Sequence, residues 1–168
     1  INLPTNLQQI GASAFSGCAK LERIDIPDSV TEISASAFSI CYGIKSIKLP
    51  NNIKKIEDSV FYYCSSIESI SIPDNVQLLG ASCFSNCSSL SNISFGNGVD
   101  YIGESAFTYC SSLENLDIPD NITYIGKNAF KACSNLRSIT FGTGLTTVDY
   151  DAFYQCDSMV NVNIGDLY

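Results

Sequence analysis

The sequence predicts a repeat solenoid of the α/β class, in which one short unit is wound and stacked about seven times. Two observations predict it: phenylalanine recurs every 23 residues, and cysteine recurs at the same interval, three positions later. The phenylalanines are Phe15, Phe38, Phe61, Phe84, Phe107, Phe130 and Phe153, and the cysteines are Cys18, Cys41, Cys64, Cys87, Cys110, Cys133 and Cys156. Each unit should form one coil, because an inserted residue would move the inward positions out of line with both neighbours.

A short strand opens each unit. Apolar and polar residues alternate in Ile24-Asp25-Ile26, which is the period of a half-buried strand. Proline ends this strand in four units, because it lacks a main-chain donor, and Phe-Gly-x-Gly takes its place in two others. In Phe95-Gly96-Asn97-Gly98 and Phe141-Gly142-Thr143-Gly144 we expect the glycines to supply positive φ angles for a tight turn.

A short helical segment is expected after the turn. Ala, Phe and Cys recur there at spacings that fit one or two turns of α-helix or 3-10 helix, as in Ala37, Phe38 and Cys41. Stacked strands would form a parallel sheet on the concave face, and the helical segments and loops would form the convex face.

The repeated unit, L-x-x-I-x-I-P-D-x-V-x-x-I-x-x-x-A-F-x-x-C, resembles that of the BspA-like leucine-rich repeats. The resemblance covers the whole chain and implies a leucine-rich-repeat right-handed solenoid. It also implies a protein-binding or adhesion module of a cell-surface or secreted protein, with extracellular-matrix or host-surface proteins as partners. One departure is that Asn75-Val76 and Asn121-Ile122 are adjacent, whereas the broader pattern separates such residues.

Residues 1–168 are expected to form one domain, as a fragment of a longer array, because no polar capping unit stands at either end. Ile1-Asn2-Leu3-Pro4 does not resemble a signal peptide, and no apolar run is long enough to span a bilayer. The net charge of −8 argues against nucleic acid and anionic membranes as partners.

The cysteines are expected to be reduced packing residues rather than disulfides or metal ligands, since parallel side chains in adjacent coils do not face each other. The eighth cysteine, Cys83, occupies an alanine position of the repeat. Acidic and amide residues after the strands could line up as a calcium ladder, but we favour turn-forming roles for them. They are Asp28, Asn51, Asp74, Asn97, Asp120 and Asp166.

No cofactor, metal site or catalytic residue is predicted. The chain contains no histidine, the usual base for a serine or cysteine nucleophile, and no pair of carboxylates stands out. A carboxylate-based enzyme acting on glycans remains an alternative that would require two acids facing each other in one cleft.

Two sets of residues are candidates for partner binding. The first set lies in two exposed rows of the expected concave sheet, whose content varies while the frame does not. Its candidates are Arg23, Asp25, Lys48, Asn92, Asn115, Asp117, Asn161 and Asn163. The second set is an apolar strip at one repeat position, Leu78, Tyr101 and Tyr124, with a further cluster of Ile40, Tyr42, Tyr62 and Tyr63 on the convex side.

The function expected first is a protein-binding adhesion module that uses the concave sheet ahead of the tyrosine strips. The alternative is a structural or assembly component that joins other chains, through self-association at uncapped ends or through the tyrosine strips. Solvated polar rows and ordinary stacking of tyrosines between coils would equally explain both sets of residues.

Overall fold

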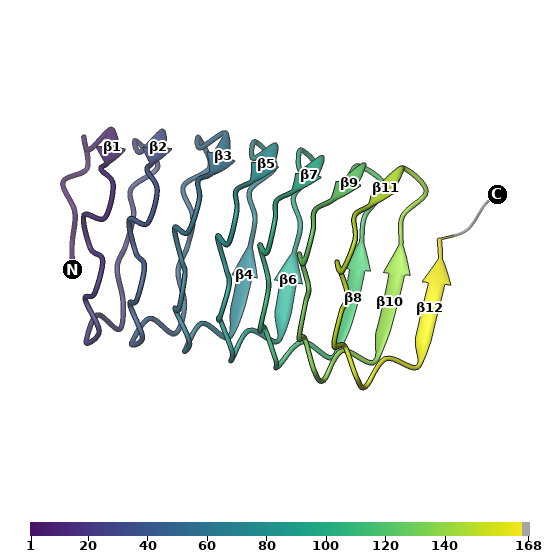
Figure 1. The fold of residues 1–168 in the computed structure, drawn as a ribbon. Coiled ribbons are helices and arrows are strands. Elements are labelled where there is room, and N and C mark those ends of the chain that lie inside the picture. Colours follow the sequence, from purple (N-terminus) through teal and green to yellow (C-terminus); the bar gives the residue numbers. More distant parts are fainter. Residues whose placement is uncertain (166–168) are drawn as a thin grey trace.

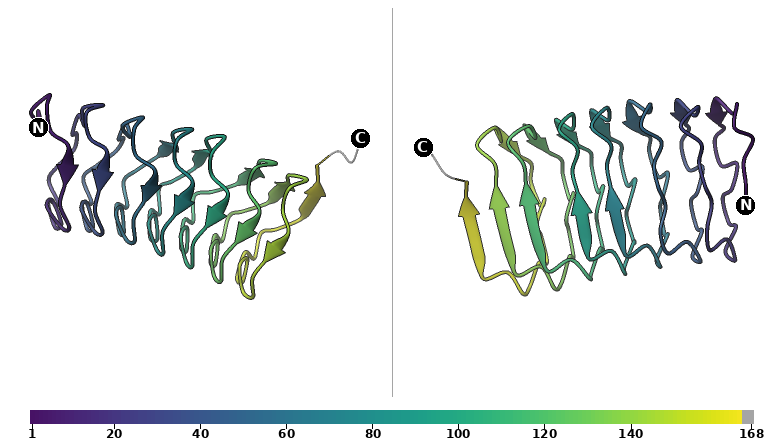
Figure 2. Two further views of the ribbon diagram at one scale, coloured as in Figure 1. Left: turned by 90° about the horizontal axis from the view of Figure 1, so that it is seen from above. Right: turned by 180° about the vertical axis from the view of Figure 1, so that it is seen from behind.

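The computed structural model describes residues 1–165, which form a parallel β-solenoid of about seven turns (Figure 1). Between Ser69 and Val148 each coil carries short strands on two sides, whereas the earlier coils carry a strand on one side and a single bridging residue on the other (Figure 2). Strands of one side, here called the first face, are β4 (Ser69–Ser71), β6 (Asn92–Ser94), β8 (Asn115–Ile118), β10 (Ser138–Phe141) and β12 (Asn161–Ile164). Strands of the other side, the second face, are β1 (Gln9–Ile10), β2 (Glu32–Ile33), β3 (Lys55–Ile56), β5 (Leu78–Leu79), β7 (Tyr101–Ile102), β9 (Tyr124–Ile125) and β11 (Thr147–Val148).

The first face contains the strands that the Ile-x-Ile alternation predicts. In β8 and β10 the outward residue Asp117 pairs with Thr140, and the inward residue Leu116 pairs with Ile139. Isolated parallel bridges from Asp25 to Asn2 and to Lys48 continue the same register into the first coils. Every ladder is parallel, so equivalent residues of successive coils lie side by side, as the sequence period predicts.

The second face is a sheet that the sequence did not reveal. Its strands are two residues long, with an outward residue followed in most strands by a buried one, as in Tyr101 and Ile102 of β7. The largest ladder runs through β3, β5, β7, β9 and β11, and β1 pairs with β2 separately. Hydrogen bonds therefore link successive coils along the second face as well as along the first.

A column of phenylalanine rings fills the interior. Consecutive rings from Phe15 to Phe153 are stacked nearly parallel, with centroids 5.2 to 5.6 Å apart. The five inner rings, Phe38 to Phe130, are fully buried, whereas Phe15 and Phe153 are half-buried. The predicted core column is thus confirmed.

The helical or 3-10 segments predicted for the convex side are wrong, because no helix occurs between residues 1 and 165. Ser36 and Ile40, on either side of Phe38, have φ angles of 58° and 61°. This left-handed backbone interrupts any helix. The Phe38 N–H donates to the Val60 carbonyl of the next coil at 3.0 Å, so it is not available for a bond within its own coil. The segment is a series of tight turns.

The glycines of the Phe-Gly-x-Gly turns also differ from the prediction. The only glycine with a positive φ in the described residues is Gly17. A Cβ atom on Gly96 would lie 2.6 Å from the Ile72 carbonyl oxygen, and one on Gly142 would lie 2.5 Å from the Pro119 carbonyl carbon. Close approach of successive coils, rather than a left-handed turn, explains these glycines.

Candidate interaction surfaces

The first face brings the predicted polar rows together. Asn92 lies opposite Ser69, and Asn115 and Asn161 both pair with Ser138. All eight candidates in these rows have exposed side chains: Arg23, Asp25, Lys48, Asn92, Asn115, Asp117, Asn161 and Asn163. The predicted rows are therefore exposed on one face, although Arg23, Asp25 and Lys48 lie outside its strands.

Charge on the first face is partly neutralised within the chain. Arg23 and Asp25 form an ion pair of 3.1 Å within one coil. Because both side chains are well exposed, such a pair contributes little to stability. The middle of the face carries small uncharged residues, such as Ser71 and Ser94, and lacks an aromatic side chain that could anchor a partner.

The second face carries the predicted apolar strip. Leu78 pairs with Tyr101, and Tyr101 pairs with Tyr124, in the ladder of β5, β7 and β9. The two tyrosine rings are stacked, with centroids 4.7 Å apart and planes within 1°. Leu78 is 38% exposed and Tyr101 is 37% exposed, whereas Tyr124 is half-buried.

Tyr124 is held in place by a side chain of the next coil. Its hydroxyl donates to Asp149 Oδ2 at 2.8 Å, and this bond is the main reason why the pKa of Tyr124 is raised. Stacking on Tyr101 and the hydrogen bond to Asp149 hold the Tyr124 ring in place in the unbound protein. A rigid aromatic surface loses little conformational entropy on binding.

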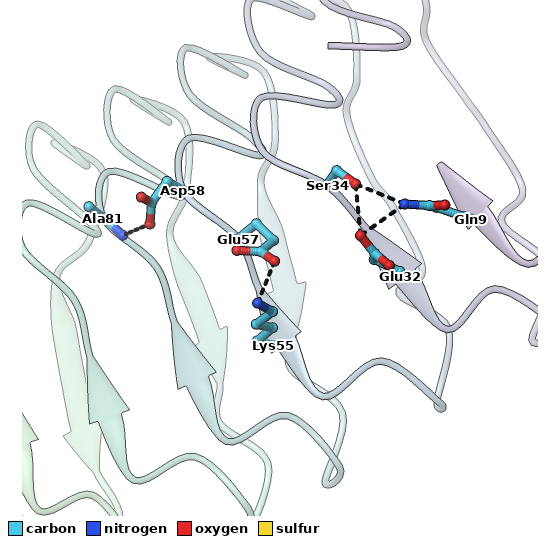
Figure 3. Close-up of polar contacts among 7 residues, drawn as sticks. All are labelled: Gln9, Glu32, Ser34, Lys55, Glu57, Asp58 and Ala81. Carbon is cyan, nitrogen blue, oxygen red and sulfur yellow. Dashed lines mark hydrogen bonds and ion pairs between the residues drawn. The ribbon is translucent and has the colours of Figure 1, made fainter. Parts of the chain in front are cut away.

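The N-terminal half of the second face is polar (Figure 3). Gln9 Nε2 donates to Glu32 Oε1 at 2.9 Å, and the Ser34 hydroxyl donates to the same oxygen at 3.1 Å. Lys55 and Glu57 form an ion pair of 2.6 Å on the following coil. The face therefore changes along the solenoid axis from paired polar groups to an apolar strip.

A third surface lies along the turns. Tyr63 makes edge contacts with Tyr42, at 6.5 Å between centroids, and with Tyr62, at 4.8 Å, so the three tyrosines of the predicted cluster lie together. The groove beside these rings also includes Tyr109, which the sequence reasoning missed. Its repeat position, two repeats after Tyr63, could have placed Tyr109 on the same surface.

Six of the eight cysteines are buried. All eight thiols are free, and only Cys18 is exposed. Burial raises the pKa of Cys41 to about 11 and that of Cys64 to about 12, so neither forms a thiolate readily. Residues 1–165 contain no group of three or more potential metal ligands.

The acidic residues after the strands accept hydrogen bonds from main-chain N–H groups at the turns. Asp74 Oδ1 accepts a hydrogen bond from the Asn97 N–H at 2.9 Å, and Asp120 Oδ1 accepts one from the Thr143 N–H at 2.7 Å. Asp28 accepts equivalent bonds from Asn51. Asp166 lies outside the described residues. Asp28, Asp74 and Asp120 lie at turns as predicted, but these bonds reach the equivalent turn of the next coil and so link successive coils. None of the described segments forms a helix able to cross a membrane.

Comparison with known proteins identifies the repeat. The family model described as a BspA type leucine rich repeat region matches residues 1–113 and 54–167, in 6 copies. No curated protein matches the sequence.

Solved structures of leucine-rich repeat proteins have the same fold. A leucine-rich repeat protein of T. pallidum is 28% identical, with a TM-score of 0.81, over 95% of this chain and 77% of that one. A leucine rich cell surface protein of Faecalibacterium prausnitzii is 25% identical, with a TM-score of 0.72, over 98% of this chain and 59% of that one. The pneumococcal vaccine antigen PcpA shares the fold at 24% identity and a TM-score of 0.67, with 85% of this chain and 40% of PcpA covered.

Proposed function

Because this chain belongs to the BspA type leucine-rich repeat family, we propose that it is a protein-binding or adhesion module of a cell-surface or secreted protein. The description of the Faecalibacterium prausnitzii relative as a cell surface protein supports this location. A solenoid offers extended, rigid faces for recognition, which suits such a role.

The observation that carries the proposal is the strip of Leu78, Tyr101 and Tyr124. Aromatic anchors that become buried supply much of the energy in protein interfaces. Here Tyr101 is exposed and stacks on Tyr124, which its hydrogen bond to Asp149 holds in place. The net charge of −8 favours a neutral or positively charged protein as partner, including a protein of the extracellular matrix or host surface. The polar rows lie on the first face, so they offer an alternative binding surface rather than a rim around this anchor.

The test measures binding of the chain to immobilised fibronectin, laminin and collagen, as defined extracellular-matrix proteins. Tyr101→Ser with Tyr124→Ser should weaken binding by about tenfold or more if the strip is the anchor. Charge reversal at Lys48 and Asp117 should then change affinity little. The opposite pattern would assign binding to the first face, and absence of binding to all three proteins would refute the adhesion proposal.

The second candidate function is assembly with other chains through the same strip. An exposed apolar strip favours self-association, whereas a net charge of −8 opposes it. Sedimentation at increasing concentration separates the two functions. A monomer at all concentrations supports the adhesion module, and association that Tyr101→Ser abolishes supports assembly.

A further inference from the structure

The groove along the turns is lined by uncharged side chains. It has a volume of about 500 Å³ and crosses successive coils from Tyr42 to Ser134. Tyrosine, serine, asparagine and alanine line it, and none of these side chains is charged at neutral pH. On a chain with a net charge of −8, such a surface suits a neutral ligand.

Two tyrosines stand in this groove on strained backbone. Tyr63 has a φ of 58° and Tyr109 has a φ of 61°, at a position that Gly17 occupies in the first coil. Glycine or asparagine adopts this conformation with less strain than a bulky residue. The same φ range recurs at this position in the other coils, as at Ile40 and Ala132, so the backbone conformation belongs to the repeated turn and the tyrosines are particular to this groove.

The tyrosines are spaced by the coil period. Tyr63 and Tyr109 occupy the same position two coils apart, which places them about 10 Å apart along the axis, twice the strand spacing. Tyr63 is 39% exposed and Tyr109 is 50% exposed. Tyr63 is braced by the edges of Tyr42 and Tyr62, at interplanar angles of 89° and 77°.

Polar groups lie between the two rings. Asn86 occupies the intermediate coil, and its Nδ2 donates to the Ser85 hydroxyl at 3.0 Å. Among residues 1–165 its side-chain oxygen has no hydrogen-bond partner, so it can accept from a ligand hydroxyl. Ser88 and Ser111 line the same groove, where the Ser111 hydroxyl donates to the Ser88 carbonyl oxygen at 3.4 Å and can accept from a ligand hydroxyl.

We propose that this groove binds a neutral, extended β-1,4-linked oligosaccharide. The C–H faces of a sugar pack on the negative face of an aromatic ring, and its hydroxyls need uncharged donors and acceptors. Each pyranose unit lengthens such a chain by about the distance between successive coils. Each sugar ring is also flipped relative to its neighbour, so it presents the opposite face. Equivalent sugar faces therefore recur every second unit, as Tyr63 and Tyr109 do.

The experiment titrates the chain with cellohexaose and, separately, with chitohexaose, with the α-linked maltohexaose as the comparison. Calorimetry gives the affinity, and tyrosine fluorescence gives a second readout because the chain contains no tryptophan. We expect saturable binding of at least one β-1,4-linked probe and none of maltohexaose. The two β-linked arms distinguish a glucose polymer from an N-acetylglucosamine polymer.

Variants assign the site. Tyr63→Ala and Tyr109→Ala should each weaken binding by about tenfold, the loss of one stacking contact. Tyr101→Ala, on the second face, should leave binding unchanged, which separates this site from the proposed protein anchor. Tyr109→Gly suits a φ of 61°, so it should bind poorly while it keeps the native melting temperature.

Three results would overturn the proposal. They are the absence of saturable binding to both β-1,4-linked probes, equal binding of maltohexaose, and unchanged affinity of the folded Tyr109→Gly variant.

Discussion

The Cys64 thiol donates a hydrogen bond to the main-chain carbonyl oxygen of Phe38, one coil earlier, at 3.1 Å. The same oxygen accepts a second hydrogen bond from the Cys41 N–H at 3.3 Å. Six cysteines, from Cys41 to Cys156, make the equivalent thiol contact to the phenylalanine 26 residues before them. The cysteine column therefore joins successive turns as well as filling space.

Replacing Cys64 by alanine should destabilise the fold by about 1 to 3 kcal/mol, because it leaves a cavity and removes this donor. Urea denaturation followed by circular dichroism measures the loss. The matched control is Cys18→Ala, since the Cys18 side chain is exposed and its removal should cost less than about 0.5 kcal/mol. Equal losses for the two variants would contradict a structural role for the thiol contact.

Thiol labelling should distinguish Cys18 from the buried cysteines. At about pH 8 a thiol-specific aromatic disulfide reagent should react quickly with Cys18 and slowly with Cys64, whose pKa burial raises to about 12. All eight thiols should react in denaturant. Mass spectrometry of peptides from the labelled protein identifies the sites, and rapid labelling of Cys64 in the folded protein would contradict its burial.

Stability should decrease in alkaline solution. The pKa of Cys64 lies at about 12 in the folded protein, above its ordinary value of 9.0, so the unfolded chain releases this proton first. The stabilising effect is complete below pH 9 and is lost as the pH rises towards 12. Denaturation midpoints at about pH 7.5, 9 and 10 should show the decrease.

The Cys64→Ala variant is the control for the alkaline effect. The two proteins differ only in this side chain, so the difference between the two pH profiles isolates the thiol. The variant should lose less stability than the native chain over the same interval. Identical slopes would show that other groups cause the alkaline loss.

Phe84→Ala should cost about 3 to 5 kcal/mol, because the ring is fully buried between Phe61 and Phe107. Phe15→Ala should cost clearly less, since Phe15 is half-buried and stacks on one ring only. Thermal and chemical denaturation of both variants gives the comparison. A Phe84 variant as stable as the Phe15 variant would argue against the central column as the main source of stability.

Gly103→Ala should destabilise the second face by about 1 to 3 kcal/mol, because an added methyl group overpacks this site. Its Cβ would lie 2.5 Å from the Leu79 carbonyl oxygen of the preceding coil. Gly11 occupies the same repeat position, but a Cβ there would meet no atom within 4 Å. Gly11→Ala should therefore be neutral, and hydrogen exchange of the β7 amides should quicken only in the Gly103 variant.

The sequence was sufficient to predict the solenoid and its interior, because a strict period places equivalent apolar residues in one column. It was not sufficient to predict the turns. Ala37, Phe38 and Cys41 have helical spacing, yet the flanking Ser36 and Ile40 adopt left-handed φ angles. A β-branched residue such as Ile40 rarely adopts this conformation, so local sequence preference pointed the wrong way. Hydrogen bonds to the next coil override that preference.

The candidate surfaces were predictable in position but not in structure. The shared repeat position of Leu78, Tyr101 and Tyr124 was enough to align the strip. The second sheet beneath it was missed because strands of two residues, such as Glu32–Ile33, are too short to show alternation. The hydrogen bond from Tyr124 to Asp149 could not be predicted either, because the two residues are 25 positions apart and the bond depends on how both side chains are oriented.

Ladder partners such as Gln9 and Glu32 are only 23 residues apart along the chain. A segment leaving the ribosome therefore meets its bonding partners as soon as one further coil has been synthesised. No early segment has to wait for a distant one to be translated, which keeps the folding problem local at every stage. The array can thus be lengthened by whole coils without changing how any earlier coil folds.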